Sequence, residues 1–181
     1  MSAGFQAVQW NRKKLVYDAI VLAGVVAFIA AFLMIGAWLK PPKNLPEAID
    51  LRIRAFGSCA FVMLTVILTI GPLARLDRRF LPLLYNRRHF GLMTFAVATL
   101  HVWFMLDWYL TLNALPNLGE ELTRWPDYAK FIGFPFKILG IVAFLVLFVM
   151  AATSHDFWLA FLTPRTWKAL HMALYVAYGS W

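Results

Sequence analysis

The chain has 181 residues, of which 62% are hydrophobic and 14% charged, with a formal net charge of +8. Soluble globular chains hold roughly 45–50% apolar and about 25% charged residues, so a typical soluble enzyme, a disordered tail and a secreted disulfide scaffold are excluded. The single cysteine, Cys59, excludes an intrachain disulfide and a thiolate cluster for zinc or iron–sulfur. Basic residues in short clusters between long apolar runs indicate a protein of the lipid bilayer rather than a nucleic-acid-binding one.

Four apolar runs are long enough to cross a membrane, which takes roughly 17–25 residues. In chain order they are Ala19 to Leu39, Ala55 to Ala74, Phe90 to Leu106 with an extension through Tyr109, and Ile138 to Ser154. The first run is longer than the roughly 7–15 apolar residues of a signal peptide, so we predict an uncleaved helix. The prolines at 41 and 42 predict its end, because proline lacks the N–H group that a helix needs.

A fifth apolar run, Ala169 to Trp181, has only thirteen residues and stops while still apolar. We expect a fragment cut inside a fifth helix; the alternative is a short helix completed by packing against a partner. The sequence thus predicts an all-α integral membrane protein, a transmembrane helix bundle with four full spans and a truncated fifth. One membrane domain, residues 1–181, accounts for the whole chain.

The basic residues predict the orientation of the bundle. Lys and Arg favour the cytoplasmic side, and five arginines lie between residues 75 and 88. With the second connection and the N-terminus in the cytoplasm, ten basic residues lie on that side and seven on the other. We therefore expect a cytoplasmic N-terminus.

The third predicted span carries a histidine near its middle. His101 lies about eleven residues, or roughly 16 Å, into this span, among apolar neighbours. An ionisable residue inside a membrane helix is costly and by default indicates function. Its imidazole can ligate haem iron through one nitrogen while the other nitrogen bonds an acceptor. The alternative is a neutral histidine hydrogen-bonded to a neighbouring helix.

The other three histidines lie nearer to the ends of predicted helices. His171, near the start of the fifth helix, fits either a ligand or an interfacial residue that contacts lipid headgroups. His89 directly follows two arginines at the start of the third span, which favours interfacial solvation. His155 is predicted to be a loop or cap residue, since Asp156 beside it is a suitable helix N-cap.

The angular positions of Arg87 and His89 around the helix show which of the two lies nearer to the face of His101. At about 100° per residue, Arg87 differs from His101 by about 40° around a regular helix, whereas His89 differs from it by about 120°. Arg87 is therefore better placed than His89 under His101. Because arginine is normally charged, it suits a salt bridge to a haem propionate better than iron ligation.

Taken together, several motifs resemble the ferric reductase-like transmembrane domain family, with the haem-binding membrane subunits of bacterial periplasmic methionine sulfoxide reductase systems as the nearest branch. The resemblance spans about residues 55–181, and the order and spacing of the motifs across three helices carry it. The motifs are Arg87-Arg88-His89-Phe90-Gly91-Leu92, Ala98-Thr99-Leu100-His101, Thr153-Ser154 and Trp167-x-x-Leu170-His171-x-x-x-Tyr175.

The resemblance implies a six-helix bundle in the bacterial inner membrane that binds b-type haem and moves electrons from an inner donor to an outer acceptor. By the same resemblance His101 and His171 are iron ligands, and Arg87 occupies a position where some relatives carry histidine. The family's second fifth-helix histidine would fall just past Trp181, so the domain is expected to be incomplete at its C-terminal end. One or two haems are expected, and a quinone or flavin donor on the cytoplasmic side is implied only by analogy.

Depth separates the two predicted ligands. His101 lies about 16 Å from the cytoplasmic face and His171 only about 3–6 Å from it, so two sites are expected more naturally than one. The inner site would hold His171 with Arg87 or His89 nearby, and the outer site would hold His101 with a histidine beyond Trp181.

The leading functional hypothesis is a membrane electron-transfer subunit, of oxidoreductase type, that works with a redox partner protein or a larger membrane complex. The alternative is a non-catalytic scaffold subunit that keeps the fold with partial or no haem. A transporter has little support, because Asp107 is the only candidate carboxylate inside the predicted spans. The motifs of nucleotide-binding and hydrolytic soluble enzymes are absent from the sequence, and no side chain is predicted to be catalytic.

Overall fold

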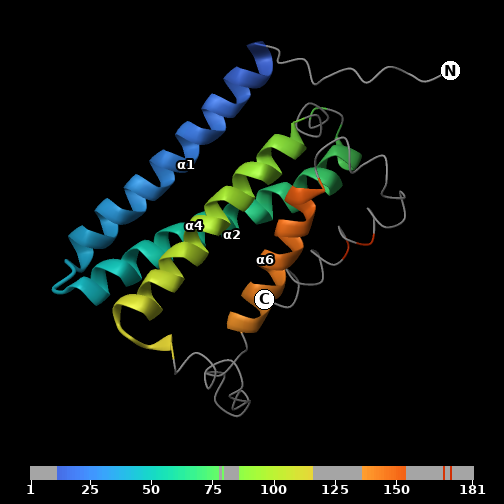
Figure 1. Cartoon of the computed structure of the whole chain (residues 1–181). Helices are drawn as coiled ribbons and strands as arrows, with labels where there is room; N and C mark the ends of the chain where they lie inside the picture. Colours follow the sequence, from blue (N-terminus) through green and yellow to red (C-terminus); the bar gives the residue numbers. More distant parts are fainter. Residues whose placement is uncertain are drawn as a thin grey trace.

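The computed structural model describes residues 12–77, 79, 86–115, 136–153, 169 and 172. Over these residues the chain forms four helices and no strand (Figure 1): α1 (Arg12–Leu39), α2 (Leu45–Leu76), α4 (Arg87–Thr111) and α6 (Phe136–Ala152). This confirms the predicted all-α membrane bundle. The predicted fifth helix, 169–181, lies outside the described residues except for Ala169 and Met172.

Three of the helices are long and apolar enough to cross a membrane, namely Lys14–Leu39, Leu45–Leu76 and Arg87–Thr111. The fourth, α6, has 17 residues and a length of about 26 Å, close to the roughly 30 Å of bilayer hydrocarbon. Helix α6 is apolar but shorter than the three candidate spans. The first helix ends at Leu39, directly before Lys40 and the two prolines, as the sequence predicts.

Helix α2 begins at Leu45, ten residues before the predicted second span. The added turns carry Asp50 and Arg54, whose side chains form an exposed i,i+4 ion pair with Nε to Oδ2 at 2.9 Å. The amide of Glu47 donates to Oδ1 of Asn44, the N-cap, at 3.0 Å. Hydropathy marks only the part of a helix that suits hydrocarbon, whereas capping and local ion pairs extend the helix beyond it.

The N-cap of α2 leads to a first prediction. Replacing Asn44 with alanine removes the acceptor for the Glu47 amide and should lower the free energy of unfolding by about 1 kcal/mol. The measurement is denaturant unfolding of the protein in mixed micelles, with Lys40→Ala, an exposed residue in the same connection, as the control. An Asn44→Ala protein as stable as the control would contradict this role.

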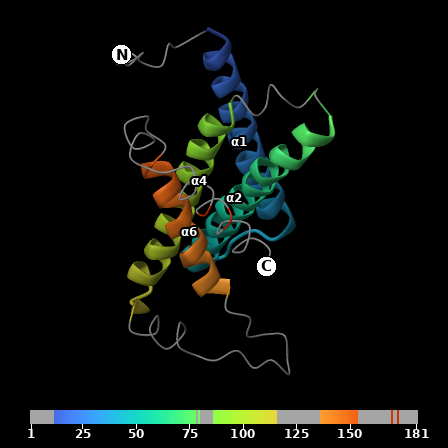
Figure 2. The same cartoon turned by 90° about the vertical axis from the view of Figure 1, so that its right-hand side faces the viewer.

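Successive helices run in opposite directions, and α4 lies between α1 and α6 with α2 packed along it (Figures 1 and 2). A Cβ on Gly91 of α4 would lie 3.2 Å from the Cδ1 of Ile67 of α2. Ten residues further along α4 and ten residues back along α2, His101 lies against Gly57. The two helices thus keep one antiparallel register over three turns, with the fully buried Thr94 between these contacts.

Two apolar clusters hold the other helices onto this pair. On one side, residues of α1 pack around Cys59, Met63 and Val97; they are Val21, Val25, Phe28 and Ile29. On the other side, α6 contributes Leu147 to a cluster with Ile67, Leu68 and Ala98. The α2–α4 pair is therefore the centre of the described bundle, and it carries the candidate site.

Candidate functional site

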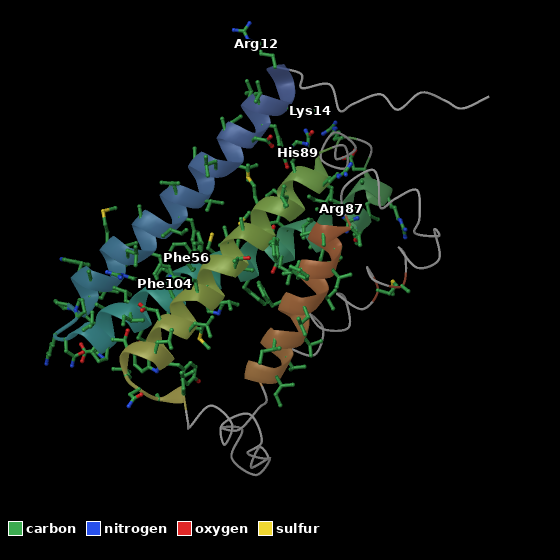
Figure 3. All side chains as sticks on the ribbon, viewed as in Figure 1. Arg12, Lys14, Phe56, Arg87, His89 and Phe104 are labelled. Carbon is green, nitrogen blue, oxygen red and sulfur yellow. The ribbon has the colours of Figure 1, made fainter. Side chains whose placement is uncertain are left out.

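His101 is held near the middle of α4, on the side that faces α2. It is separated from Arg87, the first residue of α4, by about 21 Å of helix and from Thr111, the last, by about 15 Å. The rings of Phe56 on α2 and Phe104 on α4, residues near Gly57 and His101 in the sequence, pack against each other with centroids 5.0 Å apart (Figure 3). His101 thus lies near the middle of a helix long and apolar enough to cross a membrane, and its side chain is partly buried.

The imidazole is oriented by the backbone of α2. Its Nδ1 lies 3.0 Å from the carbonyl oxygen of Ile53. A carbonyl oxygen can only accept, so Nδ1 carries the proton and donates it. The neutral ring then has its lone pair on Nε2, and ring geometry directs that lone pair away from the Ile53 carbonyl.

The alternative to a haem ligand is a neutral histidine hydrogen-bonded to a neighbouring helix, and the structure contains such a bond. However, the bond uses only Nδ1. A ligating histidine almost always donates its other ring N–H to a carboxylate, a backbone carbonyl or water, which fixes the tautomer and raises the basicity of the ligating nitrogen. His101 therefore fits an axial ligand of haem iron through Nε2.

A second histidine of α4, His89, contacts α1 rather than α2. Nδ1 of His89 lies 3.0 Å from Oδ2 of Asp18 on α1, and their side chains are 27% and 19% exposed. The other carboxylate oxygen of Asp18, Oδ1, is buried and has no hydrogen-bond partner among the described residues. The pair joins α1 to the first turn of α4, near the end of the bundle where Arg12, Lys14 and Arg87 also lie (Figure 3).

The two described histidines therefore belong to different places, since His89 turns to α1 and His101 to α2. This agrees with the angle of about 120° between them on a regular helix. Arg87 is the first residue of α4, about four turns below His101. His171 and His155 lie outside the described residues, so the pairing of His101 with His171 stays a prediction. No group of three His, Cys, Asp or Glu side chains suited to a metal ion occurs in the described part of the chain.

Three residues of these sites were not singled out by the sequence: Asp18, Ile53 and Gly57. Asp18 is the first acidic residue of the chain and follows three basic residues within a turn or two, a pattern that indicates a local ion pair rather than a partner on another helix. A glycine inside an apolar helix, such as Gly57, signals close approach without naming what approaches. Ile53 acts through its backbone carbonyl, which carries no signal in the side-chain sequence.

Comparison with known proteins places these residues in a wider context. Residues 55–180 match the family described as ferric reductase like transmembrane component. The matched range holds most of α2 and all of α4 and α6, with His101, Phe56 and Phe104. Helix α1, with Asp18, lies outside the matched range. No solved structure matches the chain.

Individual relatives fall into two groups. The haem-binding subunit MsrQ of protein-methionine-sulfoxide reductase from Enterobacter sp. (strain 638) is 37% identical over 120 residues, which cover 66% of this chain and 55% of that subunit. The corresponding subunit of Salmonella newport is 35% identical over the same length. The magnetosome protein MamZ of Magnetospirillum gryphiswaldense is 35% identical over 123 residues, which cover 68% of this chain but 17% of that protein. The chain thus spans about half the length of the haem-binding subunits that it matches.

Proposed function

Because the chain belongs to the ferric reductase-like transmembrane component family, we propose that it is a haem b electron-transfer subunit of a bacterial inner membrane. The observation that supports this most directly is His101, held near the middle of α4 with Nδ1 bonded to the Ile53 carbonyl and Nε2 not used by that bond. The name of the haem-binding relatives supports haem as the group bound. A bound haem would supply one-electron exchange at its iron.

The residues of this chain have separate roles in the proposal. His101 would supply one nitrogen ligand from α4, and His171 would supply a second ligand, to the same iron or to another. Arg87 is the cation for a propionate, because its guanidinium is permanently charged and forms paired hydrogen bonds to carboxylates. The apolar residues of α1, α2 and α6 around α4 exclude water and lower the local dielectric, which is one of the protein's means of tuning a haem potential.

The family resemblance implies electron flow from an inner donor to an outer acceptor, and the proposed orientation says which end of the bundle is the inner one. Arg12 and Lys14 on α1 and Arg87 on α4 lie at one end of the bundle (Figure 3), and basic residues favour the cytoplasmic side. We place the electron donor, a quinone or a flavin, at this end, and the acceptor, a redox partner protein, at the other. A scaffold subunit without haem is the competing function.

The absorption spectrum of the full chain separates these functions. After purification in mild detergent from cells supplied with haem, the electron-transfer function predicts a Soret band and a reduced-minus-oxidised α-band of b type, with one or two haems per chain. A protein that shows neither band, and acquires neither when haem is added, would be the scaffold.

A further inference from the structure

Gly57 on α2 is the residue against which the ring of His101 lies. A Cβ placed on Gly57 would be 2.9 Å from Cε1 of His101, 3.1 Å from Nδ1 and 3.5 Å from Nε2. The edge of the ring that carries Cε1, between the two nitrogens, therefore faces the Cα of this glycine. Contacts shorter than about 3.0 Å essentially do not occur for real Cβ atoms, so any other residue here requires the ring to move.

The ring has little freedom to give way. Its Nδ1 is held at 3.0 Å from the carbonyl oxygen of Ile53, which is one helical turn before Gly57. On α2 the neighbouring side chains of Ala55 and Cys59 are 0% and 3% exposed. The Phe56–Phe104 ring pair joins the same two helices. A displacement that admits a Cβ would therefore strain the Nδ1 hydrogen bond or push the two helices apart.

From this geometry we propose that Gly57 is a positioning residue for His101. Its missing side chain lets the imidazole lie on α2, so that Nδ1 donates to Ile53 and Nε2 would be the nitrogen available to a metal. Gly57 acts through His101. The inference rests on the proposed function, since it concerns how the proposed ligand is oriented.

The test compares three glycine variants of the full chain. Gly57→Ala should weaken haem binding by about 10- to 100-fold, the usual effect of losing a residue that orients a metal ligand. The haem that remains should be partly high-spin by electron paramagnetic resonance. Its midpoint potential should be higher, because an imidazole without its Nδ1 acceptor is a weaker donor to iron.

Two other glycines serve as matched controls. Gly91→Ala also places a Cβ in the α2–α4 interface, 3.2 Å from the end of the Ile67 side chain, but ten residues from His101. Gly24→Ala lies on α1 with nothing within 4 Å of the added Cβ. Both should keep the wild-type spin state and potential. Equal changes in Gly57→Ala and Gly91→Ala would assign the effect to helix packing and overturn the proposal.

The tautomer of His101 gives a second readout that needs no variant at Gly57. In the full chain with ¹⁵N-labelled histidine, nuclear magnetic resonance before haem is added should show His101 protonated on Nδ1, with His101→Ala used to assign the signal. Protonation on Nε2 instead would overturn the proposal. If His101→Ala left the haem spectrum unchanged, the assignment of His101 as a ligand would be wrong. If His101→Ala changed the spectrum but Gly57→Ala, like Gly24→Ala, did not, the assignment would stand and the positioning role of Gly57 would be wrong.

Discussion

Replacing His101 with alanine is expected to remove or convert most of the low-spin haem absorbance of the purified protein. Among the described residues His101 is the one histidine near the middle of a candidate span, and alanine leaves a space that water fills only as a weak ligand. The measurement is the reduced-minus-oxidised α-band per protein, together with haem content. His155→Ala, at a residue predicted to be a loop or cap, is the control and should keep the wild-type spectrum.

The same spectra in His171→Ala decide between one haem site and two. If His101 and His171 bind different haems at different depths, each variant should lose a different spectral species, and the wild type should hold two haems per chain. If both variants lose the same species and the wild type holds one haem, the two histidines share an iron. That result would overturn the two-site prediction, which rests on a difference in depth of about 10 Å.

The sequence predicts the helices where the lipid hydrocarbon requires a run of apolar residues. The apolar runs located α1, α4 and α6 to within a turn or two of their observed bounds, because a membrane span and its helix nearly coincide there. They placed the start of α2 ten residues too late, since its first turns carry Glu47, Asp50 and Arg54 at the membrane surface. Those turns are set by the Asn44 cap and the Asp50–Arg54 pair, which hydropathy does not register.

The candidate site was also predictable only in part. His101 was predictable from depth alone, because an imidazole in mid-membrane demands a partner. The identity of that partner was not predictable, since it is the backbone carbonyl of Ile53, 48 positions earlier in the chain. Asp18 lies 71 positions from His89, and only the packing of α1 on α4 brings them together. Pairing across helices depends on register, and the sequence of one chain does not state the register.

The Asp18–His89 pair leads to the last prediction, which concerns the attachment of α1. Replacing His89 with alanine removes the hydrogen bond to Oδ2 of Asp18, whose Oδ1 already has no described partner. A buried carboxylate without partners is strongly unfavourable. We expect His89→Ala to lower the free energy of unfolding by about 2–3 kcal/mol, less than for a fully buried pair because both side chains keep some exposure.

Replacing Asp18 should lower the free energy of unfolding less than replacing His89, and this difference is the test. Asp18→Asn keeps an oxygen that accepts from Nδ1 of His89 and removes the buried charge, so the loss should stay below about 1 kcal/mol. In the double variant His89→Ala/Asp18→Asn the penalty of the unpaired carboxylate is gone, so this protein should be more stable than His89→Ala alone. Unfolding in mixed micelles measures all three variants, and a crosslink between cysteines introduced into α1 and α4 reports whether α1 stays in place. If the double variant were less stable than His89→Ala, Asp18 would stabilise the bundle through some group other than His89, and the pair would not be what holds α1 to α4.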